Sequence, residues 1–199
     1  MQTAPTIFEC EYIAQGYVNI AGVDEAGRGA MAGPVVACAV ILPPGLIIPG
    51  VYDSKKLSPL RRAQLEEQIK NAAIAYSYGI VSEKTIGEIN ILQASLLAMR
   101  QALDGLGVAP GFALIDGNKL PQNMPCGGIC IKQGDSKSHT IAAASILAKE
   151  KRDSIMCELA AAYPMYGFEV HKGYGTATHR LAVQVHGSCA AHRKGFNWK

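Results

Sequence analysis

Two adjacent acidic residues stand in an apolar, glycine-rich stretch near the N-terminus. Asp24 and Glu25 occupy the first part of NIAGVDEAGRGAMAGPVVACAVIL, residues 19–42. Burying one unpaired charge costs free energy, and burying two like charges together costs more. A functional role in which a counter-charge offsets that cost is therefore the favoured interpretation of this pair.

Two more aspartates end predicted strands. Asp116 lies at the end of GFALIDGN, residues 111–118, and Asp135 ends GGICIKQGD, residues 127–135. Functional side chains gather at strand ends in open α/β sheets. If these ends lie together, the converging carboxylates need either protons or divalent cations. Because all the ligands are oxygens, Mg²⁺ or Mn²⁺ fits, whereas zinc and copper do not.

Such a cluster predicts phosphodiester hydrolysis. Two ions about 3.5–4 Å apart can activate water and stabilise the leaving oxygen. Other interpretations remain open, since Asp116 could be a turn residue and Asp135 could cap the following helix. The stretch GRGAMAG, residues 27–33, resembles a dinucleotide-binding loop only weakly, because its third glycine comes one place late and two acids precede it.

The elements expected around these acids form one mixed α/β fold. The segments 18–24 and 34–43 predict an antiparallel hairpin with a long glycine-containing loop. Further strands are expected at 73–82, 111–118 and 127–135, and helices at 58–73, from about 89 to 105, 138–163 and 176–185. This order predicts a mixed sheet with helices on both faces and a small C-terminal helical piece.

Composition and charge limit the class of protein. The chain has 199 residues, 49% of them hydrophobic, which suits one globular core. Residues 1–130 carry a net charge of −2 and residues 131–199 carry +5, so a phosphate-rich partner is expected near the C-terminal part. Cys38 and Cys157 are expected to be buried, reduced thiols. With no signal peptide and no bilayer-spanning run expected, a cytoplasmic protein without membrane contact is predicted.

Seven motifs in a fixed order resemble those of bacterial ribonuclease HII, the type 2 ribonuclease H family. They are GVDEAGRG with AGPVVA, DSKKLS, INILQASLLAM, IDGNKLP, KQGDS, AAASILAKEKRD and HKGYGTATH, and they span nearly the whole chain. The resemblance implies a ribonuclease H-like mixed β-sheet flanked by helices, with a small C-terminal helical extension. We expect a catalytic domain over residues 1–165 and an extension over residues 166–199 packed on it.

The resemblance also implies an activity. A metal-dependent endoribonuclease is expected, which hydrolyses the RNA strand of RNA–DNA hybrids and cuts 5′ to ribonucleotides embedded in duplex DNA. Metal-activated water would leave 3′-hydroxyl and 5′-phosphate ends. The cofactor would be Mg²⁺ or Mn²⁺, with two ions once substrate is bound. A monomer is expected, and the sequence shows no clamp-binding motif of the kind found in archaeal relatives.

The functional residues of the family transfer onto matching positions. Its catalytic, metal-binding carboxylates fall on Asp24, Glu25, Asp116 and Asp135. The main chain of Gly27, Arg28 and Gly29 would read the ribose 2′-hydroxyl, the group that separates RNA from DNA. Tyr174 would pack against the deoxyribose just past the RNA–DNA junction. Contacts with the nucleic-acid backbone are expected from Ser54, Lys55, Asn118, Ser145 and Lys149.

Some charged residues receive other roles. Arg193 is expected to add a phosphate contact. A solvated surface position is favoured for Arg61 and Arg62. Asp153 is a competing acid for the metal site, but its basic neighbours favour an ion-paired structural role.

Two other functions stay open. A non-catalytic module that binds hybrids would use the acids as caps and would bind regardless of chelator. A carboxylate-pair hydrolase such as a glycosidase would work without metal in an aromatic-lined cleft. Aromatic residues make up only 7% of the chain, which disfavours that cleft.

Overall fold

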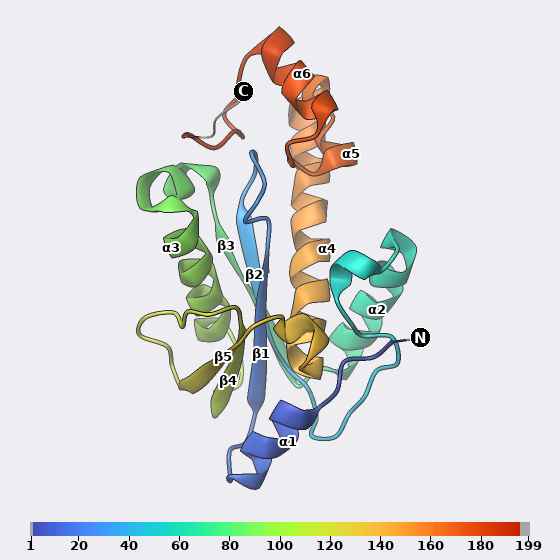
Figure 1. Cartoon of the computed structure of the whole chain (residues 1–199), viewed down its shortest axis with the longest axis vertical. Coiled ribbons are helices and arrows are strands. Elements are labelled where there is room, and N and C mark those ends of the chain that lie inside the picture. The colour runs from blue at the N-terminus through green and yellow to red at the C-terminus, as the bar shows by residue number, and fades with distance from the viewer. Residues whose placement is uncertain (1, 196–199) are drawn as a thin grey trace.

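A five-stranded mixed sheet forms the centre of the computed structural model, which describes residues 2–195. Its strands are β1 Ile20–Ala26, β2 Val35–Ile41, β3 Ala75–Val81, β4 Phe112–Asp116 and β5 Gly127–Ile131. They lie in the order β3-β2-β1-β4-β5 (Figure 1). β2 is antiparallel to both β1 and β3, whereas β4 is parallel to β1 and β5 is parallel to β4. The predicted hairpin and mixed sheet are confirmed.

Helices cover both faces of the sheet. The α-helices are α1 Ile7–Ala14, α2 Pro59–Ala72, α3 Glu83–Asp104, α4 His139–Ala162, α5 Phe168–His171 and α6 Ala177–His186. Short 3₁₀ turns are η1 Ser54–Lys56, η2 Gly134–Ser136 and η3 Pro164–Tyr166. Figure 1 shows α3 on one side of the sheet, α2 and α4 on the other, and α5 with α6 near the C-terminal end of α4. No sequence pattern predicts α1 or α5.

Side-chain caps determine where the predicted helices begin. Ser58, Ser138 and Thr176 each accept a hydrogen bond from the backbone N–H three residues further on, as N-cap residues do. The helix predicted from about residue 89 begins earlier than its apolar pattern, at Glu83 of α3. Asn90 has a φ of 66° inside α3, and its Oδ1 accepts from the N–H of Leu92 at 3.0 Å. The apolar periodicity thus marks the segment that follows this kink.

The core lies between the sheet and the two helical layers. Alternate β2 residues face opposite sides: Ala37 and Ala39 pack in the cluster that includes α3, and Cys38 and Val40 in the cluster that includes α4. Glycine permits close approach, because a Cβ on Gly22 of β1 would overlap the α4 main chain at Thr140. The closely packed β1–α4 pair places the end of β1 beside the middle of α4.

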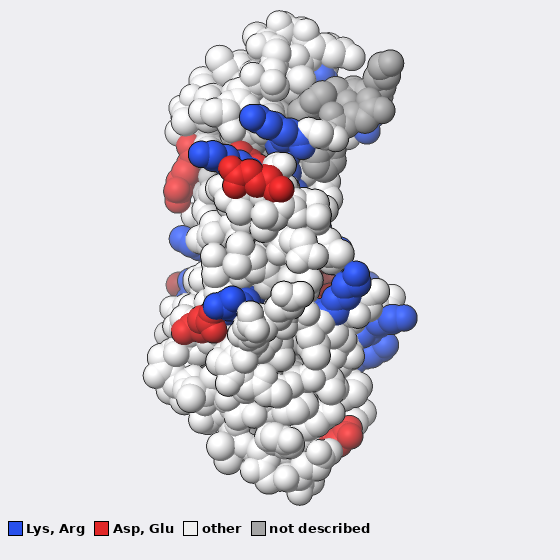
Figure 2. All heavy atoms as spheres, turned by 90° about the vertical axis from the view of Figure 1, so that its left-hand side faces the viewer, with Lys and Arg blue, Asp and Glu red and all other residues white. Residues whose placement is uncertain are grey.

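The surface shows mixed charge and bears on two predictions. On the face that α3 presents, the charged residues of the described chain are few, and both signs are interspersed (Figure 2). No helix within residues 2–195 is both long and apolar enough to cross a membrane. Cys38 is buried as predicted, but Cys157 is exposed, because it lies on the solvent side of α4. The division into residues 1–165 and 166–199 stays a prediction.

Candidate active site

β1 presents two adjacent carboxylates just before its last residue. Asp24 Oδ1 accepts a hydrogen bond from the Glu25 N–H at 2.7 Å, and the Ser145 side chain also hydrogen-bonds Asp24. Burial raises the pKa of Asp24 well above its ordinary value, and the charges of Glu25 and Asp116 add to this. Burial also raises the pKa of Glu25 to about 7, although the Arg28 guanidinium acts in the opposite direction.

β4 carries the third acid at its end, as predicted. Asp116 Oδ1 accepts a hydrogen bond from the Gly134 N–H at 2.7 Å, which ties the end of β4 to η2. Asp135 lies within η2, so the prediction that it ends a strand is wrong. β5 stops at Ile131, because Gln133 adopts a left-handed conformation with φ 57° and turns the chain away from the sheet.

The four predicted acids influence one another electrostatically. The charge of Asp116 adds to the effect of burial in raising the pKa of Asp24, Glu25 and Asp135. The acids also affect Lys55. Partial burial alone would lower the pKa of Lys55, but nearby acids, among them Asp24, Asp135 and Asp116, raise it above its ordinary value. Segments far apart in sequence therefore form one electronegative centre with a lysine beside it.

The donor set of this centre suits a hard divalent cation. The groups that could hold an ion are the carboxylates of Asp24, Glu25, Asp116 and Asp135, and oxygen donors are those that Mg²⁺ and Mn²⁺ prefer. A cation would also relieve the repulsion that raises these pKa values. Within the part of the chain that the structure describes, no three His, Cys, Asp or Glu side chains are gathered into a ready-made ion site.

A cavity of about 320 Å³ opens next to the β1 acids. It is lined by the end of β1, the loop that follows, η1, one face of α4 and the loop before α6: Asp24, Glu25, Ala26, Gly27, Arg28, Gly29, Ser54, Lys55, Ser145, Lys149 and Tyr174. Every residue expected to contact nucleic acid is in this lining except Asn118 and Arg193. Asn118 is exposed in the bend after β4, two residues beyond Asp116.

Short polar contacts connect the lining residues. Ser54 Oγ lies 3.0 Å from Ser145 Oγ, and Ser145 in turn hydrogen-bonds Asp24, so η1, α4 and β1 are joined at the cavity. Arg28 Nη1 lies 3.4 Å from Glu25 Oε1. The cavity thus has acids at its β1 side and cationic side chains around them.

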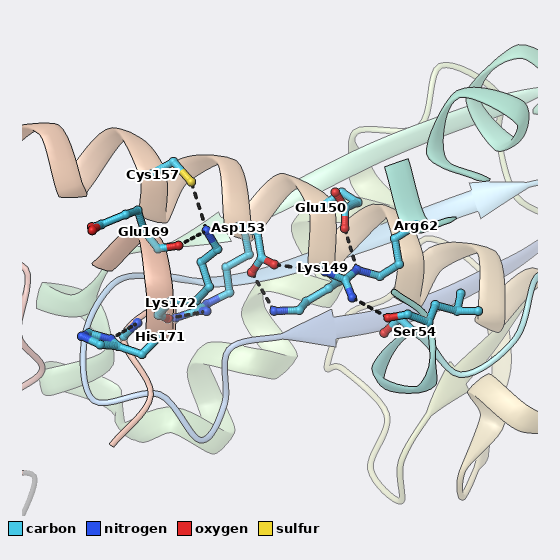
Figure 3. Close-up of polar contacts among 12 residues, drawn as sticks. Ser54, Arg62, Lys149, Glu150, Asp153, Cys157, Glu169, His171 and Lys172 are labelled. Carbon is cyan, nitrogen blue, oxygen red and sulfur yellow. Dashed lines mark hydrogen bonds and ion pairs between the residues drawn. The ribbon is translucent and has the colours of Figure 1, made fainter. Parts of the chain in front are cut away.

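An ionic network on α4 flanks the cavity (Figure 3). Asp153 Oδ1 lies 2.7 Å from Lys149 Nζ, and its Oδ2 lies 3.6 Å from Arg62 Nη2. Arg62 Nε also donates to Glu150 Oε1 at 2.6 Å. The ion-paired role predicted for Asp153 is confirmed. The solvated position predicted for Arg62 is wrong, because its side chain is buried against α4 by these two acids.

The prediction that Arg193 contacts a phosphate of the nucleic acid is wrong, because its side chain is buried. It is 2% exposed, and its guanidinium donates to four main-chain carbonyls of the β1–β2 loop. The acceptors are the oxygens of Arg28, Ala30, Gly33 and Pro34, at 2.8 to 3.2 Å. The guanidinium therefore organises the loop whose first residues line the cavity.

Arg152 holds the same loop to the one that carries Tyr174. Its guanidinium donates to Ala32 O and Pro34 O of the β1–β2 loop and to Lys172 O at 2.9 to 3.1 Å. Sequence reasoning missed this role, although a signal exists. Every fourth residue of α4 from 144 to 160 lies on the same buried face, and Arg152 is the only charged one among them. The others are small or apolar: Ala144, Ala148, Met156 and Ala160.

Comparisons with known proteins agree with this geometry. A family model described as Ribonuclease HII matches residues 21–198. Ribonuclease HII of Chlamydia caviae is 54% identical over 192 residues, which cover 96% of this chain and 90% of the relative. Ribonuclease HII of Geotalea uraniireducens is 51% identical over 195 residues, which cover 96% and 89%. The crystal structure of ribonuclease H2 from Pyrococcus horikoshii OT3 superposes with a TM-score of 0.73 at 26% identity, covering 90% of this chain and 94% of that one.

A mixed five-stranded sheet flanked by helices, with carboxylates at the strand ends, defines a nuclease of the ribonuclease H-like fold. Within that class, the chain belongs to the ribonuclease HII family. It therefore has ribonuclease H activity, which acts on RNA–DNA hybrids.

Proposed function

We propose that this ribonuclease H also cuts duplex DNA on the 5′ side of an embedded ribonucleotide, and that it leaves 3′-hydroxyl and 5′-phosphate ends. One observation carries the proposal. The cavity beside Asp24 and Glu25 is lined by Gly27, Arg28 and Gly29 of the loop after β1 and by Tyr174. A ribose-reading element and an aromatic platform therefore flank the same acids.

The loop at residues 27–29 has free main-chain donors. Among the described residues, no hydrogen bond uses the N–H of Arg28 or Gly29. Gly29 has no side chain, so a sugar can approach its amide closely. These donors suit a ribose 2′-hydroxyl, which distinguishes a ribonucleotide from its DNA neighbours.

The cavity also supplies charges for a nucleic-acid backbone. Lys55 and Lys149 line it beside the acids and would bind phosphates of the cut strand. The ring of Tyr174 offers an apolar face that would pack on the deoxyribose after the ribonucleotide. Asn118, exposed beyond β4, would reach the backbone from outside the cavity lining.

The four acids would hold Mg²⁺ or Mn²⁺, with two ions expected when substrate is bound. Such ions supply activation of water and stabilisation of the leaving oxygen. The protein's part is to keep the carboxylates oriented: the Glu25 N–H and the Ser145 side chain hold Asp24, and the Gly134 N–H holds Asp116. A nearby cation would lower the raised pKa values of Asp24 and Glu25 and keep both ionised.

The test compares cleavage of duplex DNA bearing one ribonucleotide in Mg²⁺ and in EDTA. Asp24→Asn should reduce cleavage by about a hundredfold to a thousandfold, the scale on which a lost transition-state contact acts. Hybrid binding in Ca²⁺ should survive. Asp104→Asn, an exposed acid on α3, is the matched control and should leave cleavage unchanged.

Two outcomes would contradict the proposal. Full cleavage by Asp24→Asn, or cleavage that EDTA does not affect, would remove the metal-dependent acids from the mechanism. Products whose 3′ ends a DNA polymerase cannot extend would contradict the proposed polarity. Family membership favours this nuclease over the non-catalytic binding module and the glycosidase. The monomeric state, the lack of a clamp-binding motif and the cytoplasmic location stay predictions.

A further inference from the structure

The position of Tyr174 in the cavity depends on main-chain contacts. Its N–H donates to the His171 carbonyl at 2.9 Å. Its ring lies 5.8 Å from Lys149 Nζ and 5.3 Å from the guanidinium carbon of Arg152. Among the described residues, no hydrogen bond holds its hydroxyl. The ring's position therefore depends on these two cations and on the contacts that hold the Tyr174 main chain.

Two buried histidines connect the Tyr174 carbonyl to the C-terminal segment. His179, in the first turn of α6, is 0% exposed, and its Nδ1 lies 3.0 Å from Tyr174 O. Its Nε2 lies 3.1 Å from Nε2 of His192. Nδ1 of His192 accepts from the Cys189 N–H at 2.9 Å. These contacts form an unbroken row from Cys189 to Tyr174, which we name the histidine row.

The two ends of the histidine row determine which ring nitrogens carry protons. A carbonyl only accepts, so Nδ1 of His179 carries a proton and donates to Tyr174 O. A main-chain N–H only donates, so Nδ1 of His192 is bare and its Nε2 carries the proton. Nε2–H of His192 then donates to the bare Nε2 of His179. Both rings are neutral, and each uses both of its nitrogens.

The surroundings of the pair favour neutral rings. The Phe168 ring lies 5.5 Å from His179, the Tyr166 ring 4.8 Å from His192, and the His171 ring stacks on His179 at 4.3 Å. Burial lowers the pKa of His192 to about 4, and the neighbouring His179 adds to this. Burial also lowers the pKa of His179. The row therefore persists at neutral pH.

We propose that His179 and His192 are positioning residues that hold Tyr174 against the RNA–DNA junction and so set the enzyme's selectivity for that junction. This inference rests on the role proposed above for Tyr174. Without the row, the Tyr174 carbonyl keeps only the Thr176 N–H, which donates at 2.8 Å from two residues further along the same loop, and the loop can shift. A displacement of about 1 Å can reduce a rate by up to about a hundredfold. A continuous RNA strand offers ribose, not deoxyribose, at that position, so its cleavage depends less on Tyr174.

The experiment measures the ratio of kcat/KM for duplex DNA with one ribonucleotide to kcat/KM for an RNA–DNA hybrid. His192→Leu removes the donor, and the ratio should fall by roughly tenfold. His192→Gln carries an amide N–H at the place of Nε2–H, so the ratio should stay within about twofold of the unmodified enzyme. His186→Leu, an exposed histidine at the end of α6, is the matched control and should change nothing.

Tyr174→Ala separates the two proposals. If Tyr174→Ala leaves the ratio unchanged, the junction role of Tyr174 fails and the positioning role fails with it. If Tyr174→Ala lowers the ratio but His192→Leu does not, or His192→Leu lowers both activities equally, only the positioning role is overturned. Adding His192→Leu to Tyr174→Ala should lower the ratio no further.

A second pair of variants covers loss of folding in His192→Leu. His192→Asn keeps an amide but is one methylene too short to reach His179, whereas His192→Gln reaches it. The ratio should therefore fall for Asn and be retained for Gln. Equal ratios for the two amides would overturn the positioning role.

Discussion

Replacing Arg193 should destabilise the whole fold, because its guanidinium serves four carbonyls at once. Arg193→Met keeps much of the volume and removes every donor. Pro34 O keeps its bond from Arg152, so three carbonyls lose their partner. A buried carbonyl that loses its partner costs about 1 kcal/mol or more, so three carbonyls give about 3 kcal/mol. That is a large part of the roughly 5–15 kcal/mol by which a domain is stable. Arg193→Lys keeps the charge but not the fork of donors, so it should recover less than about half of this loss.

Urea unfolding followed by circular dichroism measures the effect. In thermal unfolding, a loss of about 3 kcal/mol corresponds to a fall in Tm of roughly 6–12 °C for a chain of this size. The control is Arg100→Met, whose exposed ion pair with Asp104 should contribute about 0.5 kcal/mol or less. A loss below about 1 kcal/mol for Arg193→Met would refute the claim that this guanidinium organises the β1–β2 loop.

Three further perturbations follow from the packing and the charges. In Gly27→Ala, the added Cβ would clash with the Arg152 guanidinium, and the backbone φ of +96° disfavours any side chain. Cleavage at an embedded ribonucleotide should therefore be slower than that of the wild-type enzyme in the same assay. Gly22→Ala pushes β1 against the α4 main chain and should lower the free energy of unfolding by about 1–3 kcal/mol or more, measured in urea. The pKa of His192 is about 4 in the folded state, against 6.5 for an ordinary histidine in the unfolded chain. The unfolded state thus takes up more protons between these values, and Tm should rise with pH across that window for the unmodified protein and less for His192→Gln.

Local patterns predicted most of the fold. A continuous apolar, β-branched run between Pro34 and Pro43 predicted the second strand of the β1–β2 hairpin, because a strand buried on both faces shows no alternation. Ser58, Ser138 and Thr176 predicted helix starts, because an N-cap hydroxyl satisfies a backbone N–H within the same turn. The end of β5 was predicted wrongly, because a left-handed residue at Gln133, which local sequence does not require, turns the chain.

The motifs name the residues of the candidate site, but they do not give its geometry. The motifs named the acids, and the structure shows that Asp116 perturbs the pKa of Asp24, Glu25 and Asp135. No motif predicts that Asn118 lies outside the cavity lining, because the spacing of residues in a motif does not say which way a side chain points after a turn.

The sequence by itself determined the element types, the helix caps and the acids available for chemistry, since each depends on residues within a few positions of one another. Only the tertiary structure decided which polar groups are buried. Arg152 and Arg193 look like surface cations in the sequence, yet both are buried by the packing of α4 and the C-terminal segment on the β1–β2 loop. A buried guanidinium must find acceptors, and here the acceptors are loop carbonyls more than a hundred residues away. Such pairings depend on which segments meet in space, a property of the whole chain that no local pattern contains.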